Sequence, residues 1–264
     1  MYQQHFGITG YPLEKGTKSL FDDGQLAVLA SRFKWLVESP GIGLITGDAG
    51  VGKTAALRQL TDTLNPHRYL VIYQPDTDCS RRDLYRNLAI ALGLEPAYRR
   101  TQLWHDIKEK VFDLVDNKQV QPIWIIDEAQ NLPTSFFRDF PSFLNYAFDS
   151  RDMMTVWLVG LPQLAYTIGR APNAALASRI HVRVQLTAMQ DHESFRGLIA
   201  HAFKEVGCNQ TLLSDSGLDL LRQASQGKPR QAGQILKAAL RLATAKGLNH
   251  LPDDLIEEAV AVVR

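Results

Sequence analysis

The sequence predicts an α/β fold with a five-stranded parallel sheet flanked by helices, followed by a small all-helical lid. Five short apolar runs alternate with helical stretches up to about residue 190. Strands of near-continuous apolar character are typical of a sheet that is covered on both faces. Beyond residue 190 only helical patterns follow, so we expect an irregular leader at residues 1–20, a core at residues 21–190 and a helical lid at residues 191–264.

Length and composition agree with a folded, ordinary protein. The chain has 264 residues, of which 45% are hydrophobic and 22% charged, enough for one large domain with a small appendage. Its net charge is +1, so a basic surface would have to come from local clustering. Cys79 and Cys208 lack metal-ligand spacing and suit a reducing compartment. With no signal peptide and no apolar run of about 18 residues, we expect a cytoplasmic protein that does not span a membrane.

The first part of the predicted core is a helix, a strand, a loop and a second helix. Residues 22–38 have apolar side chains at helical spacing, and a Pro-Gly pair ends that helix. The apolar run at residues 42–46 is the first strand, and a glycine-rich loop follows at residues 47–53. A helical pattern then continues over residues 54–64 until a proline ends it.

Four further strands and four lid helices complete the prediction. The strands are residues 69–74, 122–127, 155–159 and 182–186. Helical stretches between them give a βαβ rhythm, which requires parallel strands and right-handed crossovers. Ser80, Asp191 and Ser214 are the predicted helix N-caps. The lid helices are residues 191–206, 214–226, 229–246 and 252–263.

The glycine-rich loop matches the phosphate-binding loop pattern at every defined position. Its residues are Gly47, Asp48, Ala49, Gly50, Val51, Gly52, Lys53 and Thr54. Glycines let backbone N–H groups close around phosphates, and the following helix adds its positive end. We expect Lys53 to reach the β and γ phosphates of ATP and the Thr54 hydroxyl to bind Mg²⁺. A chance glycine-rich turn is the alternative, but the strand before the loop and the helix after it favour a nucleotide site.

The third predicted strand ends in two carboxylates, Asp127 and Glu128. Open parallel sheets bind ligands at the carboxyl ends of their strands. We expect Asp127 to hold Mg²⁺ through water and Glu128 to polarise the attacking water as general base. These roles predict an ATPase rather than a small-molecule kinase. An acidic cap on the surface is the alternative.

With these two motifs and a helical lid, the whole chain resembles an AAA+ ATPase, whose P-loop core carries such a lid. It is more narrowly similar to the ExeA or general-secretion-pathway-A group, which includes the transposition regulators of the TnsC, TniB and MuB kind. The similarity rests on the phosphate loop, on the segment DEAQNL at residues 127–132, and on the leader residues Tyr2, His5, Phe6, Gly7, Ile8 and Pro12. Members act as rings or filaments in which a neighbour completes the ATP site, so the resemblance implies a homo-oligomer.

The resemblance also implies roles for two arginines. Arg179 matches the position of an arginine finger that reaches into the adjacent subunit, with Arg183 as the second choice. Arg230 matches the lid arginine that reaches back to the nucleotide. The alternatives are a solvent-exposed arginine and an ordinary first-turn arginine. Leu161 departs from the pattern because relatives place a polar phosphate sensor there, so either Gln163 substitutes for it or hydrolysis is slow.

Arginines cluster on both sides of the helix after the second strand. The cluster residues are Arg81, Arg82, Arg86, Arg99 and Arg100. In the transposition relatives the matching loops face DNA threaded through the ring, which implies phosphate contacts by these arginines and by Thr101. Arginine binds phosphates through bidentate contacts that do not read sequence. A solvated helix face is the alternative.

Together these features predict an ATP-dependent regulator of DNA transposition that oligomerises on double-stranded DNA without strong sequence specificity and recruits or activates a transposase. A secretion ATPase of the same group is expected to carry a membrane span and a wall-binding extension, and these 264 residues contain neither. A secretion or envelope-assembly ATPase with protein clients stays open as an alternative. A nucleotide switch with low turnover is a third possibility, favoured by Leu161.

Overall fold

The computed structural model describes residues 2–17, 19–146, 148 and 150–263, which form two compact units. The lid unit comprises Met1–Leu26, Asp48–Gln59 and Thr187–Arg264. The sheet unit comprises Ala27–Gly47 and Leu60–Leu186. Each unit combines segments that are separate along the chain, because the units are defined by contacts between residues. The predicted division of the chain at residues 20 and 190 stays a prediction.

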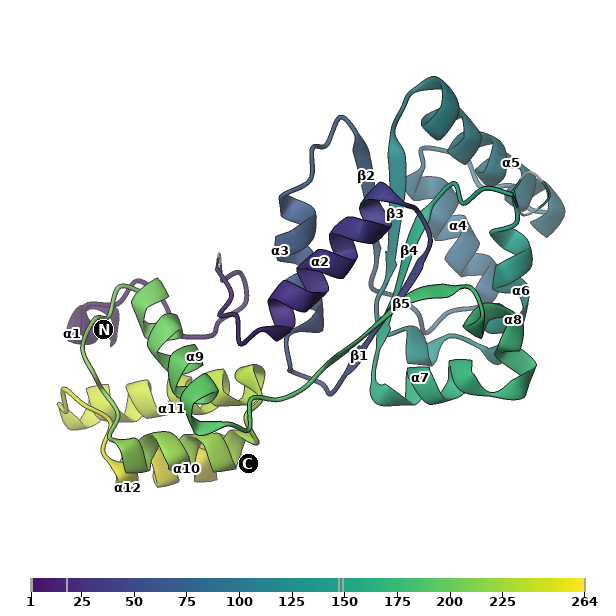
Figure 1. Ribbon diagram of the computed structural model, residues 1–264. Coiled ribbons are helices and arrows are strands. Elements are labelled where there is room, and N and C mark those ends of the chain that lie inside the picture. The colour runs from purple at the N-terminus through teal and green to yellow at the C-terminus, as the bar shows by residue number, and fades with distance from the viewer. Residues whose placement is uncertain (1, 18, 147, 149, 264) are drawn as a thin grey trace. The chain divides into compact units, whose positions relative to one another are not determined.

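The sheet unit is built on five parallel strands, which confirms the predicted fold class (Figure 1). Their order across the sheet is β2-β3-β4-β1-β5. Each strand lies within one or two residues of the predicted run because continuous apolar sequence is what a covered strand needs. The strands are β1 (Ile42–Gly47), β2 (Tyr69–Gln74), β3 (Gln121–Ile126), β4 (Thr155–Gly160) and β5 (Ile180–Leu186).

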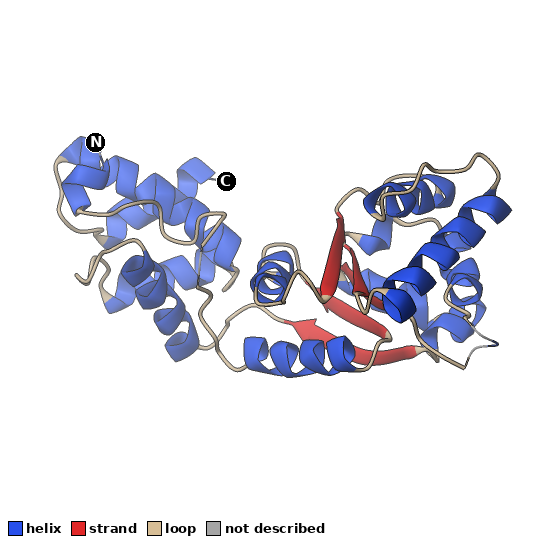
Figure 2. Cartoon of the chain, turned by 90° about the horizontal axis from the view of Figure 1, so that it is seen from above, coloured by secondary structure: helices blue, strands red, loops and turns tan. Residues whose placement is uncertain are grey.

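Helices cover both faces of this sheet (Figure 2). On one face Leu44, Trp124 and Leu158 pack in a single core with the helices of the middle of the chain. Side chains alternate between faces along a strand, so the neighbouring Trp157 points to the other face, where it stacks on Phe33 at 5.8 Å between ring centroids. The helices are α2 (Gln25–Glu38), α4 (Arg81–Ala91), α5 (Arg100–Phe112), α6 (Thr134–Phe143), α7 (Pro162–Gly169) and α8 (Ala174–Ala177), with the π-helix η1 (Asp113–Asn117) and the 3-10 turns η2 (Ala129–Asn131) and η4 (Ala171–Asn173).

The helix α6 turns three phenylalanines toward the core. Phe136, Phe140 and Phe143 are fully buried and pack among Tyr85 and Trp124. Their spacing of three and four residues places them on one helix face. These three buried rings therefore stabilise the sheet unit.

Five helices of the described lid unit share one apolar core. They are α1 (Tyr2–Phe6), α9 (His192–Glu205), α10 (Asp215–Ser225), α11 (Pro229–Lys246) and α12 (Asp253–Val263). Most of α3 (Lys53–Asp62) also belongs to the lid unit, and its last residues belong to the sheet unit. The leader, expected to be irregular, begins with the short α1. Tyr11 of the leader is buried in the lid core, where its hydroxyl accepts a hydrogen bond from Arg241 Nε at 3.0 Å. The leader is thus part of the lid core.

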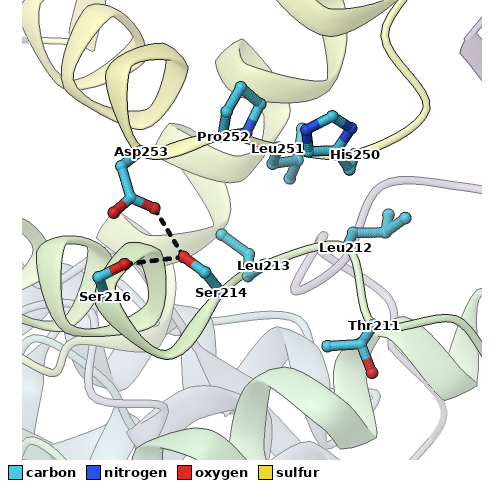
Figure 3. Close-up of a pocket in the computed structure, with 9 residues that line it drawn as sticks. All are labelled: Thr211, Leu212, Leu213, Ser214, Ser216, His250, Leu251, Pro252 and Asp253. Carbon is cyan, nitrogen blue, oxygen red and sulfur yellow. Dashed lines mark hydrogen bonds between the residues drawn. The ribbon is translucent and has the colours of Figure 1, made fainter.

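Two lid helices start side by side at an open pocket (Figure 3). The Ser214 hydroxyl accepts the N–H of Gly217 and so caps α10, as predicted. The same hydroxyl donates to Asp253 at the start of α12 at 2.6 Å, and Ser216 lies 3.0 Å from it. Hydrogen bonding from Ser214, and then from Ser216, lowers the pKa of Asp253 below its usual range. Side-chain capping thus ties the two helix starts together.

Within the described part of the chain, no helix is both long and apolar enough to cross a bilayer.

A glycine in β1 makes the contact between α2 and the sheet possible. A Cβ added at Gly43 would lie 2.3 Å from ring atoms of Trp157, which is fully buried against Phe33. We therefore expect Gly43→Ala to lower the free energy of unfolding by about 1–3 kcal/mol, measured by urea denaturation. Gly169→Ala is the control, because no atom lies within 4 Å of the added Cβ. Equal stability of the two variants would contradict this packing.

Candidate functional site

The phosphate loop connects the end of β1 to the start of α3. Gly50 has φ +86° and Gly52 has φ +104°, conformations that only glycine adopts without strain. Val51 donates its backbone N–H to the Asp48 carbonyl at 3.5 Å, which closes the turn. The two positive φ angles bend the backbone into the kind of turn that presents N–H groups to an anion.

Lys53 begins α3 and is 6% exposed. Its ammonium group donates to the backbone carbonyl of Asp48 at 2.9 Å, across the loop. Thr54 is the next residue of the helix and is half-buried. A lysine and a hydroxyl at a helix N-terminus are the groups that bind phosphate oxygens and Mg²⁺ in this kind of loop.

The start of α11 contacts the phosphate loop within the lid unit. Lys228 Nζ lies 3.1 Å from Asp48 Oδ2, and the Arg230 N–H donates to the Gly50 carbonyl at 3.2 Å. A Cβ added at Gly50 would lie 3.0 Å from the Arg230 Cβ. Arg230, predicted from the family resemblance, is therefore adjacent to the loop, and its own side chain is exposed.

Asp127, directly after β3, is 4% exposed, and its carboxylate accepts hydrogen bonds from two neighbours. Its Oδ1 accepts the N–H of Glu128 at 2.9 Å, and its Oδ2 accepts the Tyr73 hydroxyl at 3.0 Å. Burial, together with the charge of Asp127, raises the pKa of Tyr73 to about 12. The phenol therefore stays protonated at neutral pH and donates to the carboxylate.

Glu128 has an exposed side chain on a constrained backbone. Its φ of +50° is uncommon for a residue with a Cβ and costs about 1–3 kcal/mol unless the surroundings hold it. The Thr77 hydroxyl, itself 1% exposed, donates to the Glu128 carbonyl at 2.8 Å. The Gln130 amide donates to Glu128 Oε2 at 2.6 Å. This backbone turn directs an accessible carboxylate out of the strand end, as a general base requires.

The residue after β4, Leu161, contacts the segment of the acidic pair through its backbone N–H. Leu161 has no polar side chain, and its N–H donates to Gln130 Oε1 at 3.1 Å. Gln163, considered as a polar substitute, is exposed in the first turn of α7. The residue that meets the end of β4 with a polar side chain is Gln130.

Both finger candidates donate to backbone carbonyls of their own unit. Arg179 Nη1 donates to the Pro141 carbonyl at 2.5 Å, and its side chain is partly buried. Arg183 lies on β5 and donates to the Ala177 carbonyl at 3.1 Å. Whether either arginine completes the site of a neighbouring subunit stays a prediction.

The two arginine clusters, predicted on both sides of one helix, meet at the starts of α4 and α5. Arg81 and Arg100 both pair with Asp139 of α6, and the second of these pairs measures 3.1 Å. The guanidinium of Arg82 lies 4.3 Å from the ring centroid of Tyr98, which is 81% exposed. Arg99 and Thr101 are exposed beside it. One surface therefore carries the predicted residues, with Asp139 neutralising part of their charge.

Four residues that contact predicted site residues were not themselves predicted from the sequence. Tyr73, Gln130, Lys228 and Asp139 each meet a predicted residue through the fold. A usable signal existed for Gln130, which follows the acidic pair within the same segment. For Asp139 no signal existed, because it is far from both arginine clusters along the chain.

Comparison with known proteins decides the family. The model of the AAA domain matches residues 37–168, which are half of the chain and contain both the loop and the acidic pair. The chain belongs to the AAA domain family. Membership in this family supports an ATPase, as the motifs predict.

One curated relative agrees with this assignment and with the general-secretion-pathway-A part of the narrower resemblance. The AAA chain is 26% identical to the general secretion pathway protein A of Aeromonas hydrophila over 257 residues. The match covers 94% of this chain and 46% of that protein. The chain therefore spans about half the length of this relative.

Solved structures confirm the fold of this AAA chain. The ORC2 protein of Aeropyrum pernix, in its ADPNP–ADP complexes, has a TM-score of 0.69 at 18% identity, over 99% of this chain and 72% of that one. The ORC1 protein of the same organism, in complex with DNA, has a TM-score of 0.69 at 18% identity, over 95% and 68%. The five-stranded sheet flanked by helices is the shared architecture.

The loop geometry predicts a strong effect of one added methyl group. Gly50→Ala would strain a left-handed residue and press on Arg230. We expect ATP affinity to fall on the order of tenfold, since strain of about 1–3 kcal/mol must be relieved by distorting the loop. Val51→Ala is the matched control and should bind ATP as the wild type does. Titration with a fluorescent ATP analogue measures both, and unchanged affinity in Gly50→Ala would contradict this role of the loop.

Proposed function

We propose that this chain is an ATP-dependent AAA+ regulator of DNA transposition that acts in the cytoplasm. It oligomerises on double-stranded DNA without strong sequence specificity and recruits or activates a transposase. The observation that carries the DNA part is the joined arginine surface at the starts of α4 and α5. The observation that carries the nucleotide part is the phosphate loop together with the acidic pair.

For ATP hydrolysis, the residues present fit a magnesium nucleotide. The Thr54 hydroxyl and the Asp127 carboxylate are hard oxygen donors of the kind that Mg²⁺ prefers. Mg²⁺, when bound, neutralises charge on the phosphate oxygens. Lys53 and the loop N–H groups bind the phosphates, and Glu128 accepts a proton from the attacking water as its oxygen bonds to the γ-phosphorus. The bond from that phosphorus to the bridging oxygen breaks, and ADP and phosphate leave.

Two arginines complete the proposed ATP chemistry. Arg230 reaches the phosphates from the lid, consistent with its backbone contact to the loop at Gly50. Arg179 of a neighbouring subunit stabilises negative charge on the γ-phosphoryl group. To do so its guanidinium leaves the Pro141 carbonyl, which links hydrolysis to assembly. Arg183 is the second choice for this role. We therefore expect slow turnover by the isolated chain.

Replacing Glu128 tests the hydrolytic role. We expect Glu128→Gln to bind ATP within about twofold of wild type and to lose about a hundredfold or more in turnover, because the amide cannot accept the proton. Calorimetric titration measures binding, and phosphate release measures turnover.

Glu95→Gln is the matched control, since Glu95 is an exposed glutamate in the loop after α4. It should hydrolyse ATP at the wild-type rate. Loss of ATP binding in Glu128→Gln, or turnover equal to wild type, would contradict the assignment.

Charge and geometry support DNA as the partner of the arginine surface. Among the described residues, Arg82, Arg86 and Arg99 have no carboxylate partner. The first turns of α4 and α5 bring two positive helix ends to the same surface. Arg82 and the exposed Tyr98 add a cation and an aromatic ring side by side. Such a surface binds the backbone of duplex DNA without reading its sequence.

DNA binding is tested with a labelled random duplex, with and without a non-hydrolysable ATP analogue, across a salt series. We expect analogue-dependent affinity that falls steeply with salt. Arg82→Ala/Arg99→Ala should weaken binding by about tenfold or more and reduce the salt slope by about two.

Lys15→Ala/Lys34→Ala removes the same charge from two exposed lysines elsewhere and is expected to bind within about twofold of wild type. Equal losses of DNA affinity in the two double variants would mean that net charge, and not the arginine surface, determines binding. Absence of binding under every nucleotide condition would refute a DNA partner.

The similarity to the general secretion pathway protein A favours a second candidate, an ATPase with protein clients in secretion or envelope assembly. It predicts ATP-driven oligomers that are indifferent to DNA. The apolar Leu161 favours a third candidate, a nucleotide switch that binds ATP and barely hydrolyses it. The DNA titration and the phosphate-release assay separate the three.

A further inference from the structure

Gln130 bridges the catalytic carboxylate and the end of a neighbouring strand. It lies in the turn η2 directly after the acidic pair. Its Nε2 donates to Glu128 Oε2 at 2.6 Å, and its Oε1 accepts the Leu161 N–H at 3.1 Å. Both polar ends of one side chain are therefore engaged within the sheet unit.

The Leu161 N–H fixes which way the Gln130 amide faces. A backbone N–H can only donate, so the amide oxygen must be the atom that points to the end of β4. The amide NH₂ group is then the one that faces Glu128, and it can only donate to the carboxylate. The orientation follows from chemistry at both ends of the side chain.

The glycine at the end of β4 leaves room for the Gln130 amide. A Cβ added at Gly160 would lie 2.4 Å from Gln130 Oε1, so the last residue of β4 must be a glycine for the amide to dock there. Gln130 is half-buried, whereas Glu128 is exposed and has several free side-chain torsions. A fixed donor therefore restrains a carboxylate that would otherwise sample many rotamers.

We propose that Gln130 is a positioning residue for the ATP hydrolysis assigned to Glu128, on which this inference rests. It holds the Glu128 carboxylate in the orientation that accepts the proton of the attacking water. Through its other end it ties that carboxylate to the backbone at the start of α7. Leu161 thus contributes by its N–H what its side chain does not supply.

The test compares two variants of Gln130 that keep the length of the side chain. Gln130→Glu still accepts the Leu161 N–H but cannot donate to Glu128 while ionised. Gln130→Met removes both hydrogen bonds without adding charge. We expect turnover to fall about tenfold or more in both variants, with the KM for ATP within about twofold of wild type. Thermal unfolding checks that each variant is folded.

Two controls separate positioning from general damage. Gln223→Glu makes the same chemical change on an exposed glutamine of α10 and should leave turnover unchanged. In a Glu128→Gln background, Gln130→Met should cause no further loss, because a residue that acts through Glu128 has nothing left to position. A further loss of tenfold in that background would overturn the proposal, as would turnover at or above the wild-type rate in the single variants.

The outcomes also distinguish this inference from the function beneath it. If Glu128→Gln abolishes turnover and the Gln130 variants hydrolyse ATP normally, the positioning role fails and the ATPase assignment stands. If Glu128→Gln hydrolyses ATP as the wild type does, the assignment of the general base fails first.

Discussion

The parallel order β2-β3-β4-β1-β5 is the constraint on which the sheet unit depends. Parallel strands place all their carboxyl ends at one edge, and β4 pairs with both β3 and β1. Gly47, Asp127 and Leu161 therefore stand at the same edge of the sheet, although they are far apart in sequence. Two carboxylates and an oriented amide are brought together there from short local segments.

Uncharged groups donate hydrogen bonds to both carboxylates at this edge. Burial of Asp127 would cost several kcal/mol without hydrogen bonds, and the Tyr73 phenol and the Glu128 N–H supply them. A hydrogen bond from a neutral donor does not remove the negative charge that a carboxylate needs to bind a cation or accept a proton. The left-handed backbone of Glu128 is held by the hydrogen bond from Thr77. The accessible Glu128 carboxylate therefore projects from a fixed backbone.

Local sequence predicted the strands, the caps and both motifs, because apolar runs, Ser80 or Ser214 before a helix, and a glycine-rich turn each depend on adjacent residues. Contacts between distant segments were not predictable in this way. Asp139 joins the two arginine clusters only after α6 packs against α4 and α5. The short α1 lacks a periodic pattern because five residues are too few to show one.

The proposed function joins ATP hydrolysis to assembly on DNA. The most direct test is steady-state phosphate release measured as a function of protein concentration, with and without random duplex DNA. We predict a rate per chain that rises with protein concentration, because the arginine of a neighbouring subunit completes the ATP site. The rate should rise further with duplex, because DNA brings the subunits together. A rate per chain that is constant and indifferent to duplex would contradict the account.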